Sequence, residues 1–214
     1  QDNPENVFYT MSYNQNVKKG VKIYPLLEDL SYVPFTDVSI SSFNATAFLP
    51  VENNLFLLGT NSGNILLVNR SSNMLVHNIV LSDDAIEKIF YVSNQNFVAQ
   101  NQAGDVYYFS INNLDTDNPE IVVSRSLTKS WLCDEAQLPF AMITDVAAKV
   151  GFHVILVHNK LILVCGTDKV EEYTLFAPGL ALQWSGVGIL PKVFCVLQNG
   201  DIQTVQLRYN GGLR

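Results

Sequence analysis

Two groups of acidic residues are the first candidates for chemistry in this sequence. Asp83, Asp84 and Glu87 stand close together, and Asp115 and Asp117 flank a single threonine. Neighbouring carboxylates can bind Mg²⁺ or Ca²⁺, or act as a general acid and a general base. Both groups fall where loops between strands are expected, and acidic residues in loops are usually part of solvated turns. We therefore predict no metal site, no cofactor and no catalytic residue, and we expect that the protein is not an enzyme.

The histidines and cysteines show no spacing that indicates a reactive centre. His77, His153 and His158 have no neighbouring partners in the pattern of a metal site or a catalytic triad. The three cysteines cannot all pair with one another, and no two of them have the Cys-x-x-Cys spacing of a zinc site. Cys165 and Cys195 fall in apolar runs typical of buried strands. Unpaired thiols favour a reducing, intracellular compartment, either nuclear or cytoplasmic.

The amino-acid composition and net charge indicate which classes of partner to expect. The chain has 214 residues, of which 48% are hydrophobic and 15% charged, which favours a large core and argues against disorder. The net charge is −7, and no basic cluster is longer than the Lys18-Lys19 pair, so direct binding of nucleic acid is not expected. No apolar run reaches the length of about 18 residues that a membrane span needs. Other protein subunits are the partners that we expect.

The elements that would position any site are repeated β-hairpins. Each hairpin has an apolar run, a tight polar turn that ends in glycine, and a second apolar run. Glycine suits such a turn because it adopts positive φ without a steric clash of Cβ. The three clear copies lie at 55–68, 97–109 and 193–205, with Gly63, Gly104 and Gly200 in their turns.

Two weaker copies complete the series. One is predicted at 161–173, with Gly166 in its turn, and another opens the chain at 7–13 and 20–24. The runs that precede the four later turns begin near residues 55, 96, 161 and 193, so the steps between them are 41, 65 and 32 residues. The long middle step indicates an insertion within 110–150 or a shifted assignment.

Further apolar segments extend the hairpins into four-stranded units. Strands that neighbouring sheets cover on both faces have near-continuous apolar runs rather than a strict alternation of polar and apolar residues. Segments of this kind, or flanking strands of the same units, are predicted at 46–49, 74–81, 86–92, 154–157 and 161–164.

With these copies in place, residues 40–210 resemble a WD40-type β-propeller. In that family an aliphatic residue stands two positions after the turn glycine, and a Trp-Asp dipeptide follows it. The three clear copies keep the aliphatic position as Ile65, Val106 and Ile202, but none has the dipeptide. The resemblance is thus to a divergent member or to another propeller family. It implies an all-β fold, a β-propeller of four-stranded blades.

The blade count implied by this resemblance is low. At about 40 residues per blade, the chain accommodates about five blades. A propeller has about four to eight blades, and most WD40-like rings have more than this chain allows. The sequence therefore indicates a small ring, a ring completed by a partner chain, or a propeller that is incomplete or has loops missing. We expect one domain over 1–214, with an inserted or irregular segment at 110–140 and a flexible tail at 208–214.

The function that this fold favours is a non-catalytic scaffold for protein–protein interaction within an intracellular multiprotein complex. By resemblance, such propellers serve in transcription and chromatin complexes, pore and coat assemblies, ribosome assembly and ubiquitin ligases. One alternative is a hydrolase-like enzyme that uses acidic residues at the central channel, for example Asp83, Asp84 or Asp145. Another alternative is a reader of peptides or modified tails.

Four residues are candidates for binding a partner. Trp131 and Leu132 lie in the segment predicted to be inserted, where a large aromatic residue can serve as a recognition element. The alternative to partner binding is that Trp131 covers the edge of a blade. Tyr91 and Trp184 are candidates for lining a pocket that takes a peptide or a methylated lysine.

Overall fold

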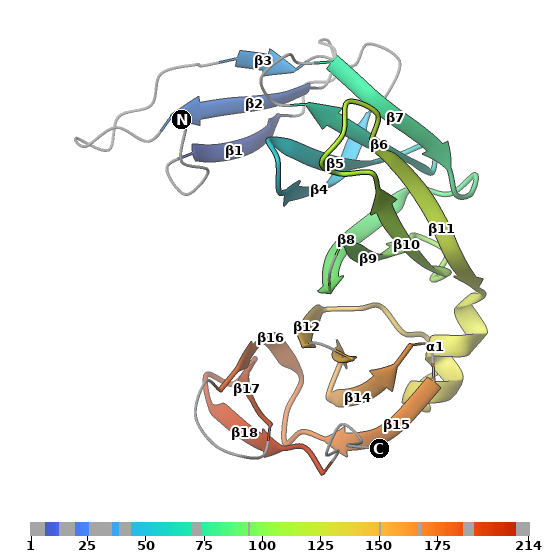
Figure 1. The fold of residues 1–214 in the computed structure, drawn as a ribbon. Coiled ribbons are helices and arrows are strands. Elements are labelled where there is room, and N and C mark those ends of the chain that lie inside the picture. The colour runs from blue at the N-terminus through green and yellow to red at the C-terminus, as the bar shows by residue number, and fades with distance from the viewer. Residues whose placement is uncertain are drawn as a thin grey trace. The chain divides into compact units, whose positions relative to one another are not determined.

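The computed structural model describes the backbone of three N-terminal strands and most of the chain after residue 43. The described residues are 7–12, 20–25 and 36–38 for the backbone alone, then 44–69, 74–93, 95–149, 151–166, 168–185 and 191–208. Within them the chain forms 18 strands and one helix (Figure 1). The strands make five antiparallel sheets, and within each sheet the strands lie in chain order. The all-β prediction is therefore confirmed.

Contacts between residues divide the chain into two compact units. Unit 1 comprises 1–89 with 111–122, and unit 2 comprises 90–110 with 123–214. Each unit is described by itself below. The prediction of one domain over 1–214 stays a prediction.

Two sheets lie at the start of the chain. The first has three described strands and the second has four, and the hairpins predicted at 7–13 with 20–24 and at 55–68 are confirmed as β1–β2 and β5–β6. Their strands are β1 (Val7–Ser12), β2 (Gly20–Pro25) and β3 (Thr36–Val38), then β4 (Ala45–Val51), β5 (Leu55–Thr60), β6 (Asn64–Asn69) and β7 (Met74–Val80).

The remaining three sheets and the helix follow. The hairpins predicted at 97–109 and 193–205 are confirmed as β9–β10 and β17–β18. The strands of the third sheet are β8 (Ile86–Ser93), β9 (Asn96–Asn101), β10 (Val106–Asn112) and β11 (Glu120–Leu127), followed by α1 (Lys129–Ala136). Those of the fourth and fifth sheets are β12 (Asp145–Lys149), β13 (Phe152–Val157), β14 (Lys160–Cys165) and β15 (Asp168–Thr174), then β16 (Gly179–Trp184), β17 (Lys192–Leu197) and β18 (Ile202–Gln206).

The hairpin predicted at 161–173 is confirmed as β14–β15, with Gly166 at a positive φ of 63°, but these are the third and fourth strands of their sheet rather than the second and third. The second and third strands of this sheet are β13 and β14, which pair antiparallel across the turn at His158 and Asn159. This turn has no glycine, because His158 itself adopts the positive φ of 52°. The second strands of the four later sheets begin at 55, 96, 152 and 192, so the steps are 41, 56 and 40 residues. The repeat is thus regular except for one insertion.

That insertion is the connection from β11 to β12, which holds α1. Its first turn is fixed by Asp105, whose carboxylate accepts a hydrogen bond from the backbone N–H of Lys129 at 2.8 Å. Gln137 ends the helix in the left-handed conformation, with φ of 55°. Fully buried Gln100 then holds the following segment, since its amide donates to the Ala141 carbonyl at 2.9 Å and accepts from the Ile143 N–H at 2.7 Å.

The segment 110–140, predicted to be inserted or irregular, is only partly so. It contains the end of β10, the whole of β11 and the helix α1. Strand β11 escaped prediction because it is an edge strand of its sheet, and only Ile121 among its residues is buried. An edge strand exposed in this way has no continuous apolar run to reveal it. The predicted tail at 208–214 lies outside the described residues, apart from Arg208.

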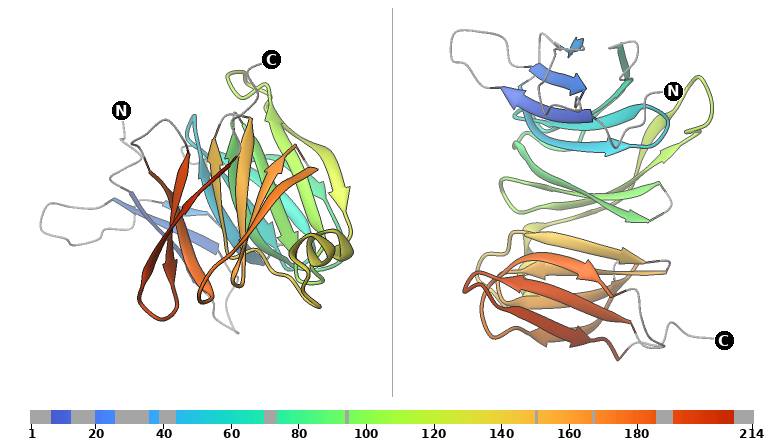
Figure 2. Two further views of the ribbon diagram at one scale, coloured as in Figure 1. Left: turned by 90° about the horizontal axis from the view of Figure 1, so that it is seen from below. Right: turned by 90° about the vertical axis from the view of Figure 1, so that its left-hand side faces the viewer.

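The core of unit 2 is built from the two faces of the β12–β15 sheet. Successive residues of β13 alternate between two apolar clusters, because side chains along a strand point to opposite faces. One face contributes Ile155 and Ile162 to a cluster with residues of β9, β10 and α1. The other face contributes Val154 and Leu163 to a cluster with β17 and β18. Figure 2 shows the β12–β15 and β16–β18 sheets layered on one another.

Candidate functional site

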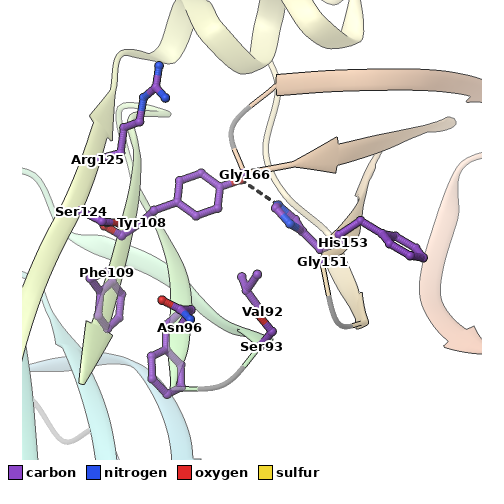
Figure 3. Close-up of a pocket in the computed structure, with 12 residues that line it drawn as sticks. Val92, Ser93, Asn96, Tyr108, Phe109, Ser124, Arg125, Gly151, His153 and Gly166 are labelled. Carbon is purple, nitrogen blue, oxygen red and sulfur yellow. Dashed lines mark hydrogen bonds between the residues drawn. The ribbon is translucent and has the colours of Figure 1, made fainter. Parts of the chain in front are cut away.

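A pocket lies between two sheets of unit 2. Its volume is about 410 Å³, and residues of the β8–β11 and β12–β15 sheets line it. This is within the range of about 300–1,000 Å³ typical of small-ligand sites. Figure 3 shows Tyr108 and His153 pointing toward one another from the two sheets. The lining residues are Val92, Ser93, Asn96, Phe97, Tyr108, Phe109, Ser124, Arg125, Gly151, Phe152, His153 and Gly166.

A buried polar pair joins the two sheets at the pocket. The hydroxyl of Tyr108 in β10 and Nε2 of His153 in β13 are 2.9 Å apart, and both side chains are buried (Figure 3). Burial lowers the pKa of His153 to about 4, so the imidazole is neutral at neutral pH. Burial also raises the pKa of Tyr108 well above its ordinary value, so the phenol stays protonated. A neutral imidazole with so low a pKa is a poor general base, and the pair is suited to holding the sheets in register.

The aromatic residues of the lining turn their rings away from the Tyr108–His153 pair, because Phe97 and Phe109 lie on the opposite face of their sheet from Tyr108, and Phe152 packs in the cluster on the β16–β18 side. Phe97 and Phe109 stack with ring centroids 5.5 Å apart and an interplanar angle of 23°. Phe152 lies on the β13 side and meets Trp184 edge to face at 5.6 Å. One lining residue carries a charge, which is Arg125 on exposed strand β11. The described lining is therefore mixed, with apolar residues, uncharged polar residues and one cationic residue.

A second feature of unit 2 is an uncovered apolar sheet face. Strand β17 alternates between buried and exposed residues, whereas β13 and β14 in the neighbouring sheet are buried along nearly their whole length. Val193 and Cys195 face the core, while the opposite face of the sheet is solvent-exposed. We call this exposed surface the outer face, and we define it by Leu180, Phe194, Val196 and Ile202.

Solved structures of the same architecture decide what these sheets are. Neither a family model nor a curated protein matches the sequence. The β-propeller domain of Myceliophteria thermophila Cps50 (Swd1) matches with a TM-score of 0.70 at 11% identity, covering 89% of this chain and 64% of that domain. The chain has a β-propeller fold. Its four- and three-stranded sheets are blades, and the predicted resemblance to WD40-type propellers is confirmed at the level of the fold.

Two further solved structures match the fold of this chain. BBS1N, solved in complex with ARL6DN, matches with a TM-score of 0.60 at 16% identity, over 91% of this chain and 61% of that one. The computationally designed Ika4 protein matches with a TM-score of 0.54 at 12% identity, over 78% of this chain and 92% of that one. The chain thus spans less than two thirds of the length of the Cps50 domain and of BBS1N.

Three of the four predicted partner-binding residues each contact another aromatic residue of unit 2, and Tyr91 among them is 52% exposed. Tyr91 meets Phe97 edge to face at 6.0 Å, and Trp131 meets Tyr108 edge to face at 6.3 Å. Trp184 packs on Phe152, with the Lys149 ammonium 5.2 Å from the centre of its indole ring. The indole N–H of Trp184 is buried and has no hydrogen-bond partner among the described residues.

Leu132, the fourth predicted residue, does not lie at the surface. Its side chain is fully buried in the cluster between α1 and the two adjacent blades. The helix explains this position, because Leu132 and Ala136 are one turn apart and form its buried stripe. A partner cannot contact Leu132 without unfolding α1. Trp131 is half-buried against the same cluster. This position agrees with the alternative that Trp131 covers the edge of a blade.

The acidic residues proposed for a channel enzyme have structural roles or face solvent. Both carboxylate oxygens of Asp145 accept backbone hydrogen bonds at 2.8 Å, one from Val146 and one from Leu182, so this residue ties β12 to β16. Asp83 and Asp84 lie exposed in the turn between β7 and β8. Among the described residues, no group of three or more His, Cys, Asp or Glu side chains could hold a metal ion.

The remaining histidines and the second acidic group are also accounted for. Nδ1 of His77 accepts a hydrogen bond from the Ile121 backbone at 3.1 Å, and His158 forms the β13–β14 turn. The Asp115 carboxylate accepts from the Asn53 amide at 2.8 Å. Within the part of the chain that the structure describes, no helix has the length and apolarity to cross a membrane.

Proposed function

We propose that this protein is a non-catalytic β-propeller subunit that binds another protein through the outer face of the β16–β18 blade. The observation that carries the proposal is the contrast between blades. The β12–β15 blade has apolar clusters on both faces, whereas the β16–β18 blade has one on its inner face alone among the described residues. Covering a Leu, Phe, Val or Ile side chain contributes about 1.5–3 kcal/mol, so an open face of four such residues favours association.

The chemistry of the outer face specifies its partner. Val196 pairs across the strands with Ile202 on one side and with Ala181 on the other, so the apolar residues are contiguous. Exposed residues beside them include Gln183 and Thr204, which are polar but uncharged, and the half-buried Lys192 places one charge at the end of β17 on this face. The natural complement is the apolar, uncharged face of another β-sheet, as the neighbouring blade provides on the inner face. We propose that a partner chain supplies that sheet and so extends the stack of blades.

Other observations agree with an intracellular complex. The cysteines Cys133, Cys165 and Cys195 are all free thiols, which fits a reducing compartment. BBS1N was solved with a protein bound to it, which makes protein binding a reasonable function for a propeller of similar fold. The complex and the pathway are not specified by these features. The proposal is therefore a protein-binding subunit in the cell interior, without a named assembly.

The test is a comparison of two charge substitutions at equally exposed residues. Ile202 on the outer face and Val80 on β7 are both 68% exposed, so Ile202→Asp and Val80→Asp should disturb folding to a similar, small extent. The tagged native protein and both variants would be purified from their own cells and the bound proteins quantified by mass spectrometry.

We expect a stoichiometric partner with the native protein and with Val80→Asp, reduced at least about tenfold with Ile202→Asp. A partner retained equally by all three proteins would contradict the proposed surface. A native protein that light scattering shows to be a homodimer, dissociated by Ile202→Asp, would replace the partner with a second copy.

A further inference from the structure

We propose that an extended segment of a second polypeptide pairs with β18 and forms the fourth strand of the β16–β18 blade. This inference goes beyond the outer face, because it concerns backbone groups at the edge of the sheet rather than side chains on its surface. It holds whether or not a partner covers the outer face.

The fifth sheet has one described strand fewer than the three sheets before it. The β4–β7, β8–β11 and β12–β15 sheets each have four strands, whereas the described part of the fifth sheet ends at β18. In the β4–β7 and β12–β15 sheets the fourth strand pairs antiparallel with the third. A segment that pairs antiparallel with β18 would therefore complete the pattern of the repeat.

The register of β17 against β18 shows which backbone groups could pair with an added strand. The Leu197 N–H donates to the Asp201 carbonyl at 2.9 Å. Hydrogen-bonded pairs alternate along an antiparallel ladder with pairs that are not hydrogen-bonded, so Gln203 and Val205 also bond to β17. The N–H and C=O groups of the intervening residues point away from β17, and no described strand pairs with them. We call these groups the β18 edge, and they belong to Ile202, Thr204 and Gln206.

The β18 edge lacks the features that usually protect an exposed strand. Charged residues, prolines and β-bulges keep edge strands from pairing with other chains. Every other edge strand of the third, fourth and fifth sheets has such a feature, since β8, β11, β12 and β15 contain charged residues and β16 contains a bulge. Strand β18 has no charge and no proline, and its register against β17 is regular. It is therefore suited to strand addition, which is a common mode of peptide binding.

Charges at the two ends of β18 indicate what the added segment contains. Exposed Asp201 precedes the strand, while exposed Arg208 follows it, with Lys192 of β17 at the same end as Arg208. An antiparallel segment begins beside Arg208 and ends beside Asp201. An acidic residue near its start and a basic residue near its end would thus complement both charges. Lys160 of β14 and Glu172 of β15, 2.7 Å apart, form such a pair between a third and a fourth strand.

The experiment is hydrogen–deuterium exchange, measured at single amides by mass spectrometry. The protein purified from its own cells, with its bound proteins, would be compared with the chain produced alone in bacteria. A partner that packs on the side chains of the outer face forms no hydrogen bond to the edge amides, so slow exchange there reports strand addition. We expect the Ile202, Thr204 and Gln206 amides to exchange at least about tenfold more slowly in the protein from its own cells. The Gln203 and Val205 amides should exchange slowly in both samples.

Two substitutions at Thr204 form a matched pair. Thr204→Pro removes the N–H that points toward the added segment and keeps the ladder with β17, whereas Thr204→Ala changes the side chain and keeps that N–H. We expect Thr204→Pro to abolish the slow exchange at Ile202 and Gln206, and Thr204→Ala to retain it. Slow exchange at Gln203 and Val205 in both variants would show that β18 remains folded.

Three results would overturn the inference. The first is rapid exchange of the β18 edge in the protein from its own cells, and the second is slow exchange that survives Thr204→Pro. The third is equally slow exchange in the isolated chain at high dilution, because the added strand would then come from the chain itself. The two proposals fail separately, since the β18 edge is tested by amide exchange and the outer face by partner capture with Ile202→Asp.

Discussion

At the scale of single residues, the Tyr108–His153 pair shows how a buried polar contact can be stable. Each group is neutral, and each satisfies the other across the two blades at 2.9 Å. The cost of burying the polar atoms is therefore offset by their hydrogen bond, provided that neither group becomes charged. This condition makes the pair sensitive to acid.

The pH dependence of stability should report His153. Because its pKa is lowered from 6.5 to about 4 in the folded protein, the unfolded chain binds a proton at a higher pH than the folded chain does. The stabilisation is complete above about pH 6.5 and is lost as the pH falls toward 4, by at most about 3 kcal/mol. Denaturant unfolding at several pH values would measure this loss.

His153→Gln is the matching variant, because Gln stays neutral and can still accept from the Tyr108 hydroxyl. We expect the native protein to be more stable at pH 7 and the difference to shrink as the pH approaches 4. Parallel curves for the two proteins would show that His153 does not take up the proton.

The sequence could not locate this pair. Tyr108 and His153 are 45 residues apart, and only the register of their strands brings them together. The predicted aromatic residues are a different case, since Tyr91, Trp131 and Trp184 each contact another aromatic ring. Large aromatic side chains usually pack against other residues. A tryptophan or tyrosine in a sequence therefore predicts a packing contact, whereas a single histidine does not.

At the scale of elements, the turn glycines explain how much of the fold could be predicted. Hairpins with Gly63, Gly104 and Gly200 were found because each glycine marks a residue of positive φ. The hairpin with Gly166 was found as well, but it was assigned to the wrong position in the repeat, because the turn between β13 and β14 has His158 rather than glycine at positive φ. Helix α1 was missed because it is short and buries just Leu132 and Ala136, too few to set a helical period.

Gly63 and Gly200 provide a test of what the turns require. Both have positive φ, at 76° and 91°, so alanine at either position costs about 1–2 kcal/mol of backbone strain. A Cβ at Gly63 would also overlap the backbone carbonyl of Ser82, while a Cβ at Gly200 would meet open space. We expect Gly63→Ala to lower the free energy of unfolding by at least about 2 kcal/mol more than Gly200→Ala. Equal losses in denaturant unfolding would mean that the Gly63 turn moves freely away from Ser82.

At the scale of the whole molecule, the regular repeat accounts for the binding surfaces. Each blade of unit 2 presents apolar side chains on both faces, and burial requires a neighbour on each side. Among the described residues, the outer face of the β16–β18 blade has no such neighbour. The sequence could predict two-sided apolar strands, but burial of each face depends on the neighbours that the fold supplies.

The most direct test of the central claim is photo-crosslinking from the outer face in the native cell. p-Benzoylphenylalanine would replace Phe194 on the outer face, with the same replacement at Phe176, which is 91% exposed in the β15–β16 loop, as the control. We predict a crosslink from position 194 to an apolar strand of a second polypeptide, and none to that strand from position 176. Crosslinks from position 194 confined to the same chain, or equal crosslinking from both positions, would contradict the account.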